Sequence, residues 1–475
     1  ARHAEGALMG ARKKSAPKWL FRKGDRVAVL GLGVSGTAAA RLIASLGGEV
    51  YASDAFDGPR QRRGAEELRA EGIEAETGRH DLERILECTL VVTSPGIDPS
   101  VEVRRAVREA GLRTVAEIEI AFRELRSRVI GITGTNGKTT TTALCGHLLE
   151  TAGVRSMTAG NIGRPLSEIA MMEEPPEWVV VELSSFQLAD LEMVRPDIGV
   201  LLNLAPDHLD RYASVERYYE DKRRLFANAT DESRWVINLD DPEVVEMARH
   251  VAGVRYGAAL HRHEEPGAFV DEEGWMCGRL EGEVARWARV ETLPLLGRHN
   301  VMNALMAGLA AALAGCGPEK LGEGLRSFHG LPHRLQPVGE FEGVLWVNDS
   351  KATNVSATRV ALGAFQRPVV AVLGGRHKGE PYASLLPTLE ENARAVIAFG
   401  EAAPRIVREL GESIPLQVAG GMEAVVREAK ERARPGDVVL FSPACSSYDM
   451  FPNYEERGHA FERAVRAVYA EASVS

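Results

Sequence analysis

The sequence contains few cysteines and none of the paired spacings that bind zinc or iron–sulfur clusters. The five cysteines are scattered through 475 residues, at Cys88, Cys145, Cys277, Cys316 and Cys445. Without CxxC pairs or other metal-ligand spacing, they are best interpreted as buried, reduced thiols. This use of cysteine predicts a protein of the cytoplasm.

Long apolar runs are also missing. No stretch reaches the roughly 20 apolar residues that a membrane-spanning helix requires. The first 25 residues are basic and lack the apolar centre of a secretion signal, so we interpret residues 1–25 as a flexible extension. The sequence therefore predicts no membrane partner.

The chain has no excess of positive charge. Its 57 Lys and Arg are outnumbered by 67 Asp and Glu, which gives a formal net charge of -10. Because nucleic-acid backbones are held by clustered Lys and Arg, this balance argues against nucleic acid as the principal ligand. At 475 residues the chain exceeds the size at which one core keeps growing, and three domains are expected.

One stretch, residues 128–142, carries the strongest functional signal. A β-branched apolar run predicts a buried strand, glycines follow at Gly134 and Gly137, and Lys138 and Thr139 open a helix. Glycine lets backbone N–H groups approach phosphate oxygens, the lysine neutralises them, and the threonine hydroxyl can ligate Mg²⁺. The glycine spacing is shorter than in the usual nucleotide loop, which would need glycine at Ile132. The alternative is a glycine-rich turn with an exposed lysine.

The N-terminal region contains a weaker glycine fingerprint. A predicted strand at 27–30 leads into Gly31-x-Gly33-x-x-Gly36, and the next strand ends at Asp54, where a dinucleotide fold places a ribose-binding carboxylate. Alone, this pattern fits a nicotinamide cofactor, another nucleotide or simple helix packing. A second turn at 94–97, expected at the same sheet edge, favours a bound ligand.

Strands and helices alternate through the whole chain, which predicts parallel α/β sheets. We expect a Rossmann-like domain over 1–118, a central P-loop domain over 119–331 and a second Rossmann-like domain over 332–475. Short alternating runs between 261 and 290 predict an antiparallel patch within the central domain. In the last domain, polar and glycine residues collect after the strands, at the edge where open α/β sheets bind ligands.

Three residues of the central domain are candidate metal ligands or catalytic groups. Glu182 ends a predicted buried strand after the nucleotide loop, where a second magnesium contact is expected, or it could only cap the next helix. His208 follows the next strand, and Lys222 lies on a helix predicted over about 215–228. Taken singly, the histidine could be a loop residue and the lysine a solvated helix residue.

Several segments taken together resemble the Mur ligase family, the ATP-dependent amide-forming enzymes of peptidoglycan precursor synthesis. The resemblance covers nearly the whole chain from about Arg26. The segments that carry it are Gly134–Thr139, Asn161–Gly163, Glu182–Gln187, Asn203, Asp207–Tyr212, Lys222, His299–Asn303, Leu331–Arg334, Asp349–Asn354 and Ser442–Ser447. The last two are similar to the signature of family members that add D-glutamate to UDP-N-acetylmuramoyl-L-alanine.

The resemblance implies an ATP site and two Mg²⁺ sites. Lys138, Glu182, His208 and Lys222 would be the catalytic residues, and Thr139 and Glu182 would share one magnesium. His208 and Lys222 would serve the second, with the lysine carbamylated, because an ammonium cannot bind a cation. The implied ATP contacts are Gly134, Thr135, Asn136, Gly137, Lys138, Thr139, Thr140, Asn303, Arg334 and Asp349.

The resemblance also implies where the other two substrates bind. The N-terminal fingerprint would hold the UDP moiety rather than NAD, and Lys378 with nearby hydroxyls would face the D-glutamate carboxylates. Ala55 and Phe56 depart from the polar residues expected beside the uracil. The implied contacts are Val34, Ser35, Asp54, Gly96 and Asn161 for the UDP-sugar substrate, and Thr353, Lys378, Ser447 and Tyr454 for D-glutamate.

Three rival interpretations use the same residues. A sister ligase or a folate-polyglutamating enzyme would share the nucleotide loop but add a different amino acid. A nicotinamide-dependent oxidoreductase would use Gly31 to Asp54 and leave the second loop structural. A nucleotide-gated binding module would carry out no chemistry. For the ligase, a monomer is expected.

Overall fold

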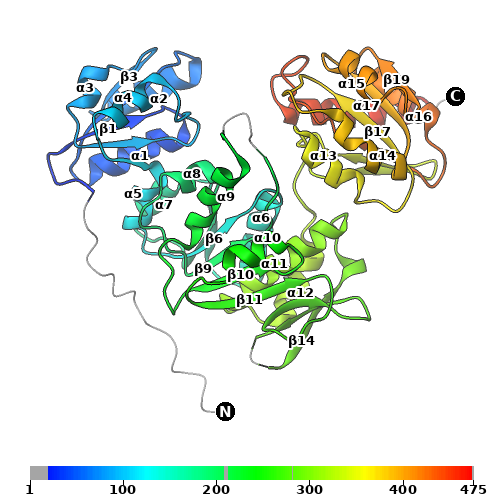
Figure 1. The fold of residues 1–475 in the computed structure, drawn as a ribbon, viewed down its shortest axis with the longest axis horizontal. Coiled ribbons are helices and arrows are strands. Elements are labelled where there is room, and N and C mark those ends of the chain that lie inside the picture. The colour runs from blue at the N-terminus through cyan, green and yellow to red at the C-terminus, as the bar shows by residue number, and fades with distance from the viewer. Residues whose placement is uncertain (1–19, 208–211, 281, 473–475) are drawn as a thin grey trace. The chain divides into compact units, whose positions relative to one another are not determined.

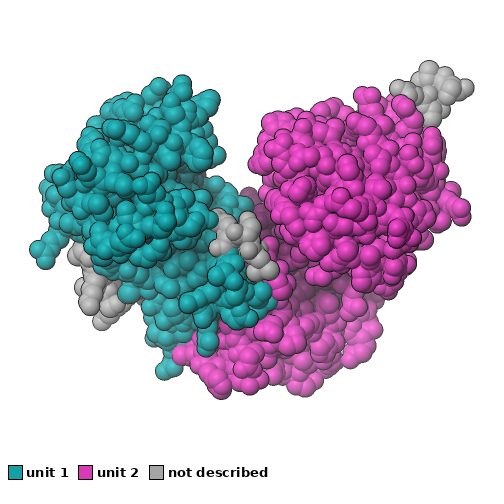
Figure 2. Space-filling model, turned by 45° about the horizontal axis from the view of Figure 1, so that its top comes forward, with its two compact units in different colours: residues 1–133, 156–199, 208–233 teal, residues 134–155, 200–207, 234–475 magenta. Residues whose placement is uncertain are grey.

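The computed structural model describes residues 20–207, 212–280 and 282–472. Figure 1 shows the order of the elements along the chain. The chain divides into two compact units, coloured separately in Figure 2. Unit 1 comprises residues 1–133, 156–199 and 208–233, and unit 2 comprises residues 134–155, 200–207 and 234–475.

Unit 1 begins with a five-stranded parallel sheet in the order β3-β2-β1-β4-β5. Its central strands are apolar on both faces, so helices cover both sides and bury residues such as Leu30, Tyr51 and Val91. The strands are β1 (Arg26–Leu30), β2 (Glu49–Asp54), β3 (Glu74–Thr77), β4 (Leu90–Thr93) and β5 (Thr114–Ala116). The helices are α1 (Val34–Ser45), α2 (Pro59–Ala70), α3 (Leu82–Leu86), α4 (Glu102–Glu109) and α5 (Glu117–Glu124).

A second parallel set in unit 1 has β8 between β6 and β7. Every residue of β8 is buried, which places Glu182 at the end of an apolar strand. Ser184 and Gln187 then form a capping box that starts α8. The elements are β6 (Arg128–Thr133), β7 (Ser156–Gly160), β8 (Trp178–Glu182), α7 (Leu166–Ala170), α8 (Ser185–Ala189), α9 (Val215–Arg223) and η1 (Arg224–Phe226). β9 (Ile198–Leu201) is divided between the two units.

Unit 2 contains the helix that follows the nucleotide loop, α6 (Lys138–Thr151), packed against α11 (Arg298–Leu313) and α12 (Pro318–Ser327). Every residue of α11 from Asn300 to Ala311 is buried, so alanines allow close packing on all sides. The antiparallel patch predicted between 261 and 290 is confirmed by β12, β13 and β14. Their bounds, with those of the preceding elements, are β10 (Arg234–Asn238), α10 (Pro242–Ala248), β11 (Val254–Ala259), β12 (Gly267–Val270), β13 (Trp275–Arg279), β14 (Val284–Arg289) and η2 (Val290–Thr292).

The remainder of unit 2 is a six-stranded sheet in the order β15-β16-β20-β17-β18-β19. Only β15 runs antiparallel, and apolar cores lie on both faces. The strands are β15 (Gln336–Phe341), β16 (Val344–Asn348), β17 (Val369–Gly374), β18 (Ala393–Phe399), β19 (Leu416–Ala419) and β20 (Val438–Phe441). The helices are α13 (Val355–Leu362), η3 (Tyr382–Leu385), α14 (Leu386–Asn392), α15 (Ala403–Leu410), α16 (Met422–Arg432) and α17 (Tyr454–Ala472).

The predicted parallel α/β architecture is confirmed, with local differences. The helix expected over about 215–228 ends at Arg223 and continues only as a 3₁₀ turn, and beyond the turn the side chain of Asn228 donates to the carbonyls of Glu192 and Val194. In the predicted linker, His333 and Leu335 adopt left-handed backbone conformations immediately before β15. Among the helices that the structure describes, none is both long and apolar enough to cross a membrane.

Candidate functional site

The nucleotide loop requires glycine at one position, Gly137. This residue has φ +82°, a left-handed conformation that side chains disfavour, at the start of α6. A Cβ atom there would lie 2.4 Å from Oδ1 of Asn303 on α11. The loop and α11 are therefore in direct contact, and the predicted loop residue and the predicted adenine contact belong to one site.

Asn203 holds the loop in shape. Its Oδ1 accepts the backbone N–H of Asn136 over 2.8 Å, and its Nδ2 donates to the carbonyl of the same residue over 3.0 Å. Thr135 is fixed in the same way, by a hydrogen bond from its hydroxyl to the carbonyl of Ala205 over 3.1 Å. Nζ of Lys138 donates to the carbonyls of Gly134 and Thr135, which places the ammonium over the loop.

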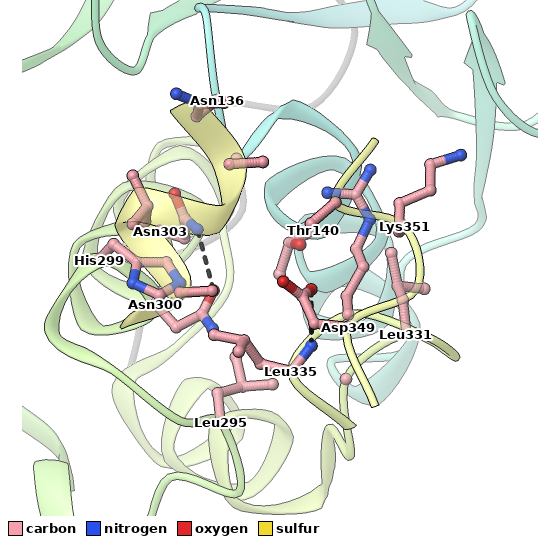
Figure 3. A pocket seen from close by; sticks show the side chains of 17 residues that line it. Asn136, Thr140, Leu295, His299, Asn300, Asn303, Leu331, Leu335, Asp349 and Lys351 are labelled. Carbon is pink, nitrogen blue, oxygen red and sulfur yellow. Dashed lines mark hydrogen bonds between the residues drawn. The ribbon is translucent and has the colours of Figure 1, made fainter. Parts of the chain in front are cut away.

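A pocket in unit 2 joins the loop to two other segments. The nucleotide loop and α6 contribute Asn136, Gly137 and Thr140 to its lining. Helix α11 and the segment before it contribute Leu295, His299, Asn300 and Asn303. Figure 3 shows Asp349 and Lys351 beside Thr140, across the pocket from Asn303 and His299. Arg334, also in the lining, donates from Nη2 to the hydroxyl of Thr139 over 2.8 Å. Six of the ten predicted ATP contacts thus line one cavity, whereas Gly134, Thr135, Lys138 and Thr139 lie outside its lining.

Apart from the cations Arg334 and Lys351, the polar groups of this pocket are neutral or can become so. Burial lowers the pKa of His299 to about 4, so its imidazole is uncharged near neutral pH. Burial raises the pKa of Asp349 to about 7, opposed by hydrogen bonds from Ser442 and from the backbone N–H of Leu335. Asn303 donates to Asn300 over 3.0 Å. Amides, a neutral ring and apolar walls suit a flat heteroaromatic base beside the phosphate loop.

Glu182, in unit 1, offers one free carboxylate oxygen. The residue is 1% exposed, and its Oε1 accepts Nδ2 of Asn161 over 2.9 Å. Its Oε2 is buried and has no hydrogen-bond partner among the residues that the structure describes. An unpaired buried carboxylate oxygen is costly unless a cation or another donor meets it. The residue therefore fits a magnesium ligand.

Lys222 is also buried, at 1% exposure, and its Nζ lies 4.6 Å from the ring centroid of Tyr218. This overturns the solvated-helix interpretation of the lysine.

His208 lies outside the described residues. Across 20–207, 212–280 and 282–472, no group of three His, Cys, Asp or Glu is placed to hold a metal. Lys138 and Thr139 belong to unit 2, whereas Glu182 and Lys222 belong to unit 1, so their meeting stays a prediction.

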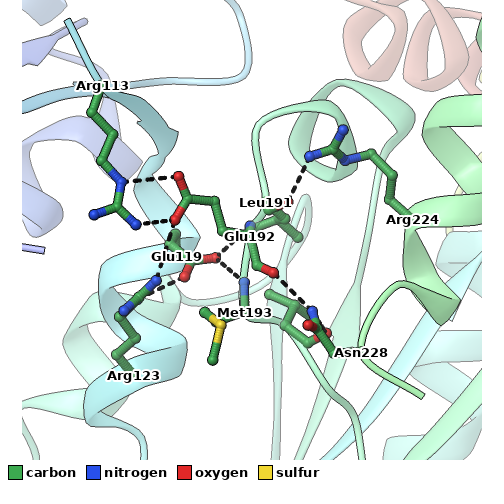
Figure 4. Close-up of polar contacts among 9 residues, drawn as sticks. Arg113, Glu119, Arg123, Leu191, Glu192, Met193, Arg224 and Asn228 are labelled. Atoms are coloured by element: carbon green, nitrogen blue, oxygen red, sulfur yellow. Dashed lines mark hydrogen bonds and ion pairs between the residues drawn. The ribbon is translucent and has the colours of Figure 1, made fainter. Parts of the chain in front are cut away.

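A buried polar network supports the end of the helix that carries Lys222. Figure 4 shows Glu119 of α5, fully buried, accepting the backbone N–H groups of Glu192 and Met193 over 3.0 and 3.1 Å. From the other side, Arg224 donates to the carbonyl of Leu191 over 2.9 Å. The segment between α8 and β9 is thereby fixed at both sides, and Arg224, which holds it, directly follows the helix that carries the buried lysine.

The N-terminal fingerprint forms a tight turn closed by Asp54. One carboxylate oxygen accepts the N–H of Leu32 and the other accepts the N–H of Phe56, both over 2.9 Å. A Cβ atom on Gly36 would lie 1.9 Å from the carbonyl oxygen of Gly31, so glycine is needed for this approach. Phe56, one of the two residues that depart from the family pattern, is 73% exposed. Val34 is exposed too, at the start of α1.

The predicted D-glutamate contacts all belong to the C-terminal part of unit 2, and the structure joins two of them directly, Lys378 and Thr353. Nζ of Lys378 donates to the hydroxyl of Thr353 over 3.3 Å. Ser447 is buried in the loop after β20, and the ring of Tyr454 lies 3.9 Å from Nζ of Lys351. The sequence did not identify Arg457, a fully buried arginine next to these loops, because nothing in its local pattern distinguishes it from other helix arginines.

Three family models match consecutive stretches of the chain. Residues 25–116 match "Mur ligase MurD-like, N-terminal domain", residues 132–311 match "Mur ligase middle domain", and residues 333–445 match "Mur ligase, glutamate ligase domain". Together with the parallel sheets of the structure, these stretches confirm the predicted three-domain α/β fold.

Curated proteins of similar sequence cover almost the full chain. A protein of Salinibacter ruber named UDP-N-acetylmuramoylalanine--D-glutamate ligase is 42% identical over 454 residues, 93% of this chain and 98% of the relative. A protein of the same name from Anaeromyxobacter dehalogenans is 43% identical over 458 residues, 93% of this chain and 97% of the relative.

Solved structures of lower identity share the fold. The MurF ligase of Thermotoga maritima in complex with ADP is 17% identical, with a TM-score of 0.57 over 88% of this chain and 95% of that chain. The UDP-N-acetylmuramate-alanine ligase MurC of the same organism is 18% identical, with a TM-score of 0.56 over 94% of this chain and 100% of that chain.

Proposed function

The chain belongs to the Mur ligase family, and from that premise we propose that it joins D-glutamate to UDP-N-acetylmuramoyl-L-alanine while ATP is converted to ADP and phosphate. The observation that carries this proposal is the similarity of this chain to proteins named for that activity. Two of them are 42% and 43% identical to it, and each comparison covers more than nine-tenths of both chains. Within this chain, the loop, α11 and the C-terminal part of unit 2 line one pocket suited to a nucleotide.

The reaction needs activation because a carboxylate does not react with an amine near neutral pH. A carboxylate oxygen of the L-alanine moiety would attack the γ-phosphorus of ATP, with ADP as the leaving group. The amine of D-glutamate, having lost a proton, would then attack the acyl carbon and release phosphate. Both steps depend mainly on positioning and charge neutralisation.

The residues of unit 2 supply the phosphate and base contacts in this proposal. Gly134–Thr140 would bind the phosphates through backbone N–H groups and the Lys138 ammonium. Asn303 would face the adenine, Asp349 the ribose, and Arg334 would turn from Thr139 to a phosphate oxygen. The support is that Asn136, Gly137 and Thr140 line one pocket with Asn303, Arg334 and Asp349, and that Arg334 donates to the hydroxyl of Thr139.

The unit 1 residues supply the acyl substrate and metal contacts. Val34, Ser35, Asp54 and Gly96 would bind the UDP moiety, and Asn161 the sugar-peptide end. Glu182 and a carbamylated Lys222, with Thr139 and His208, would hold two Mg²⁺ ions, which supply positive charge to the phosphates when bound. The unpaired Oε2 of Glu182 and the burial of Lys222 support these roles.

Boundaries near residues 118 and 331 would separate a UDP-binding domain, an ATP-binding domain and a domain for the incoming amino acid. The matched stretches, which break at 116–132 and 311–333, support them. All proposed contacts lie on one chain, so a monomer acting in the cytoplasm is the simplest active form.

Phosphate release tests the proposal. With ATP, Mg²⁺ and UDP-N-acetylmuramoyl-L-alanine present, D-glutamate should stimulate release, whereas L-glutamate, L-alanine and L-lysine should not. Stimulation by another amino acid instead would assign a sister ligase. Tight binding of NADH without D-glutamate-dependent turnover would favour an oxidoreductase.

A further inference from the structure

Arg457 is buried without a carboxylate partner. It lies near the start of α17, is 0% exposed, and has no ion pair among the residues that the structure describes. Its guanidinium donates instead to three neutral acceptors: the hydroxyl of Ser350 over 3.0 Å, the carbonyl of Ser350 over 2.8 Å, and the carbonyl of Cys445 over 3.0 Å. A buried charge held only by neutral groups is uncommon, because desolvation is costly.

The charge is retained despite burial. Desolvation lowers the pKa of Arg457 to about 10, with the Cys445 thiol and Asp449 acting in the opposite direction. The guanidinium is therefore protonated at neutral pH. Because Asp449 lies beyond ion-pair distance and its Oδ2 accepts the N–H of Glu401, the positive charge is not neutralised by contact with a protein carboxylate.

The three acceptors fix the loops that carry the predicted D-glutamate contacts. Ser350 is three residues before Thr353, and Cys445 is two residues before Ser447. The hydroxyl of Ser350, which accepts from Arg457, in turn donates to the carbonyl of Tyr454 over 2.8 Å. Arg457 thus contacts the loop after β16 and the loop after β20, and the Ser350 hydroxyl links it to the first residue of α17.

The loop after β17, which carries Lys378, is held against the same group. A Cβ atom on Gly375 would lie 2.9 Å from Nη1 of Arg457, so this glycine permits close approach. The next residue, Arg376, exchanges two backbone hydrogen bonds with Ser446, over 2.9 and 3.0 Å. All four predicted contacts therefore lie within a few residues of a group that touches Arg457.

We propose that Arg457 is the positioning residue of the D-glutamate site, where one guanidinium sets the geometry of the contact loops and leaves a positive charge for a dicarboxylate substrate to neutralise. The inference rests on the proposed function and deepens it. Arg457 acts through Ser350, Cys445 and Gly375. It favours a dianionic substrate because its hydrogen-bond acceptors in the protein are neutral and do not compensate its positive charge.

Steady-state kinetics of three variants test this role. Arg457→Met removes the positive charge and all the N–H donors of the guanidinium. Arg457→Lys keeps the charge, but its single ammonium cannot reach all three acceptors. Arg466→Met, which removes an exposed arginine of the same helix, is the matched control. We expect Arg457→Met to raise the KM for D-glutamate by roughly tenfold or more. Arg457→Lys should fall between it and wild type, and the KM for ATP should change less than about twofold in every variant.

Inhibition by glutarate, a dicarboxylate without an amine, separates this role from a purely structural one. Its inhibition constant should rise in Arg457→Met in parallel with the KM for D-glutamate and recover in part in Arg457→Lys. The proposal is overturned if D-glutamate and glutarate bind Arg457→Met as they bind wild type, or if KM rises equally for all three substrates. If Arg457→Met fails to fold, the same comparison in Arg457→Lys decides. Wild type without D-glutamate-dependent turnover would instead overturn the proposed function before any variant is made.

Discussion

Arg334 donates a hydrogen bond to the hydroxyl of Thr139 over 2.8 Å, although the two residues are 195 positions apart in the chain. Thr139 stands in the first turn of α6, where unpaired backbone N–H groups favour anions. The guanidinium therefore lies where the phosphates of a nucleotide are expected. It is the residue that links the C-terminal part of unit 2 to the nucleotide loop.

Replacing Arg334 should weaken ATP binding more than it weakens the fold. Arg334→Met removes the charged donor, and we expect the KM for ATP to rise by roughly tenfold or more, because a charge-assisted contact contributes about 1.5–3 kcal/mol. Steady-state kinetics at saturating D-glutamate measure this. Arg326→Met, at an exposed position of α12, is the control and should behave as wild type. An unchanged KM for ATP would refute the phosphate role.

The unpaired oxygen of Glu182 gives a direct test of the metal interpretation. Glu182→Gln keeps the side-chain shape and the acceptor for Asn161, but replaces a carboxylate ligand by an amide. We expect turnover to fall by about 100-fold or more and the Mg²⁺ concentration for half-maximal activity to rise. Titration with MgCl₂ measures both. Glu177→Gln, exposed and just before the same strand, should leave the titration unaltered.

Lys222 should be needed for chemistry beyond its contribution to the core. Lys222→Ala removes a buried stem packed on Tyr218, so a loss of about 1–3 kcal/mol in unfolding free energy is expected. Turnover should disappear while the protein stays folded. Intact-mass spectrometry in bicarbonate buffer should detect the added carboxylate on wild type only. Lys320→Ala, exposed and paired with Glu323, is the control, and full activity in Lys222→Ala would exclude the metal role.

The carboxyl group of Asp349 should lower the free energy of unfolding near neutral pH, although we propose that it contacts the nucleotide. Its pKa is raised from 3.8 to about 7 in the folded chain, so between these pH values the native state binds the extra proton. Stability contributed by the protonated form is present below about pH 4 and is lost as pH rises towards 7. Asp349→Asn should remove this loss and gain up to about 4 kcal/mol above pH 7.

Denaturant unfolding at pH 5, 6, 7 and 8 measures the difference between wild type and Asp349→Asn, which should grow with pH. The KM for ATP should rise in the same variant, since an amide would replace the anion that we propose faces the ribose. Asp231→Asn, at an exposed position, should show neither effect. A difference that stays constant with pH would mean that Asp349 does not titrate in this range.

The parts of the site that could be predicted are those determined by residues close together in the sequence. The nucleotide loop could be predicted because strand, glycines, lysine and helix lie within 15 consecutive residues. Glu182 could be placed for the same reason, at the end of an apolar strand. The solvated alternative for Lys222 was wrong, since burial depends on how α9 packs and its sequence is mostly polar.

Arg457 could not be predicted from its own segment. Its partners are Ser350, 107 positions away, and a backbone carbonyl, which is the same for any residue type. Likewise, Asn203 fixes the loop through the backbone of Asn136, 67 positions away. The left-handed backbone of His333, with its ring hydrogen-bonded to Asn348, is again set by packing between distant segments. Such contacts arise from topology, which periodicity does not specify.

Gly137 and Gly153, at the two ends of α6, separate backbone strain from steric collision. Both have left-handed φ, +82° and +77°, but a Cβ atom on Gly153 would meet nothing within 4 Å, whereas one on Gly137 would lie 2.4 Å from Asn303. Gly153→Ala should therefore cost about 1 kcal/mol, the strain alone. Gly137→Ala should cost about 1–3 kcal/mol more, because the loop or α11 must move.

The functional result should separate the two variants further. Displacing Asn303 or the loop disturbs the adenine and phosphate contacts together, so Gly137→Ala should lose ATP binding in isothermal calorimetry, while Gly153→Ala binds as wild type. Adding Asn303→Ala to Gly137→Ala relieves the collision and should recover part of the lost stability but not ATP binding, because the adenine contact is then missing. Equal stability of the two single variants would show that the loop does not press on Asn303, and the shared site inferred from that contact would be wrong.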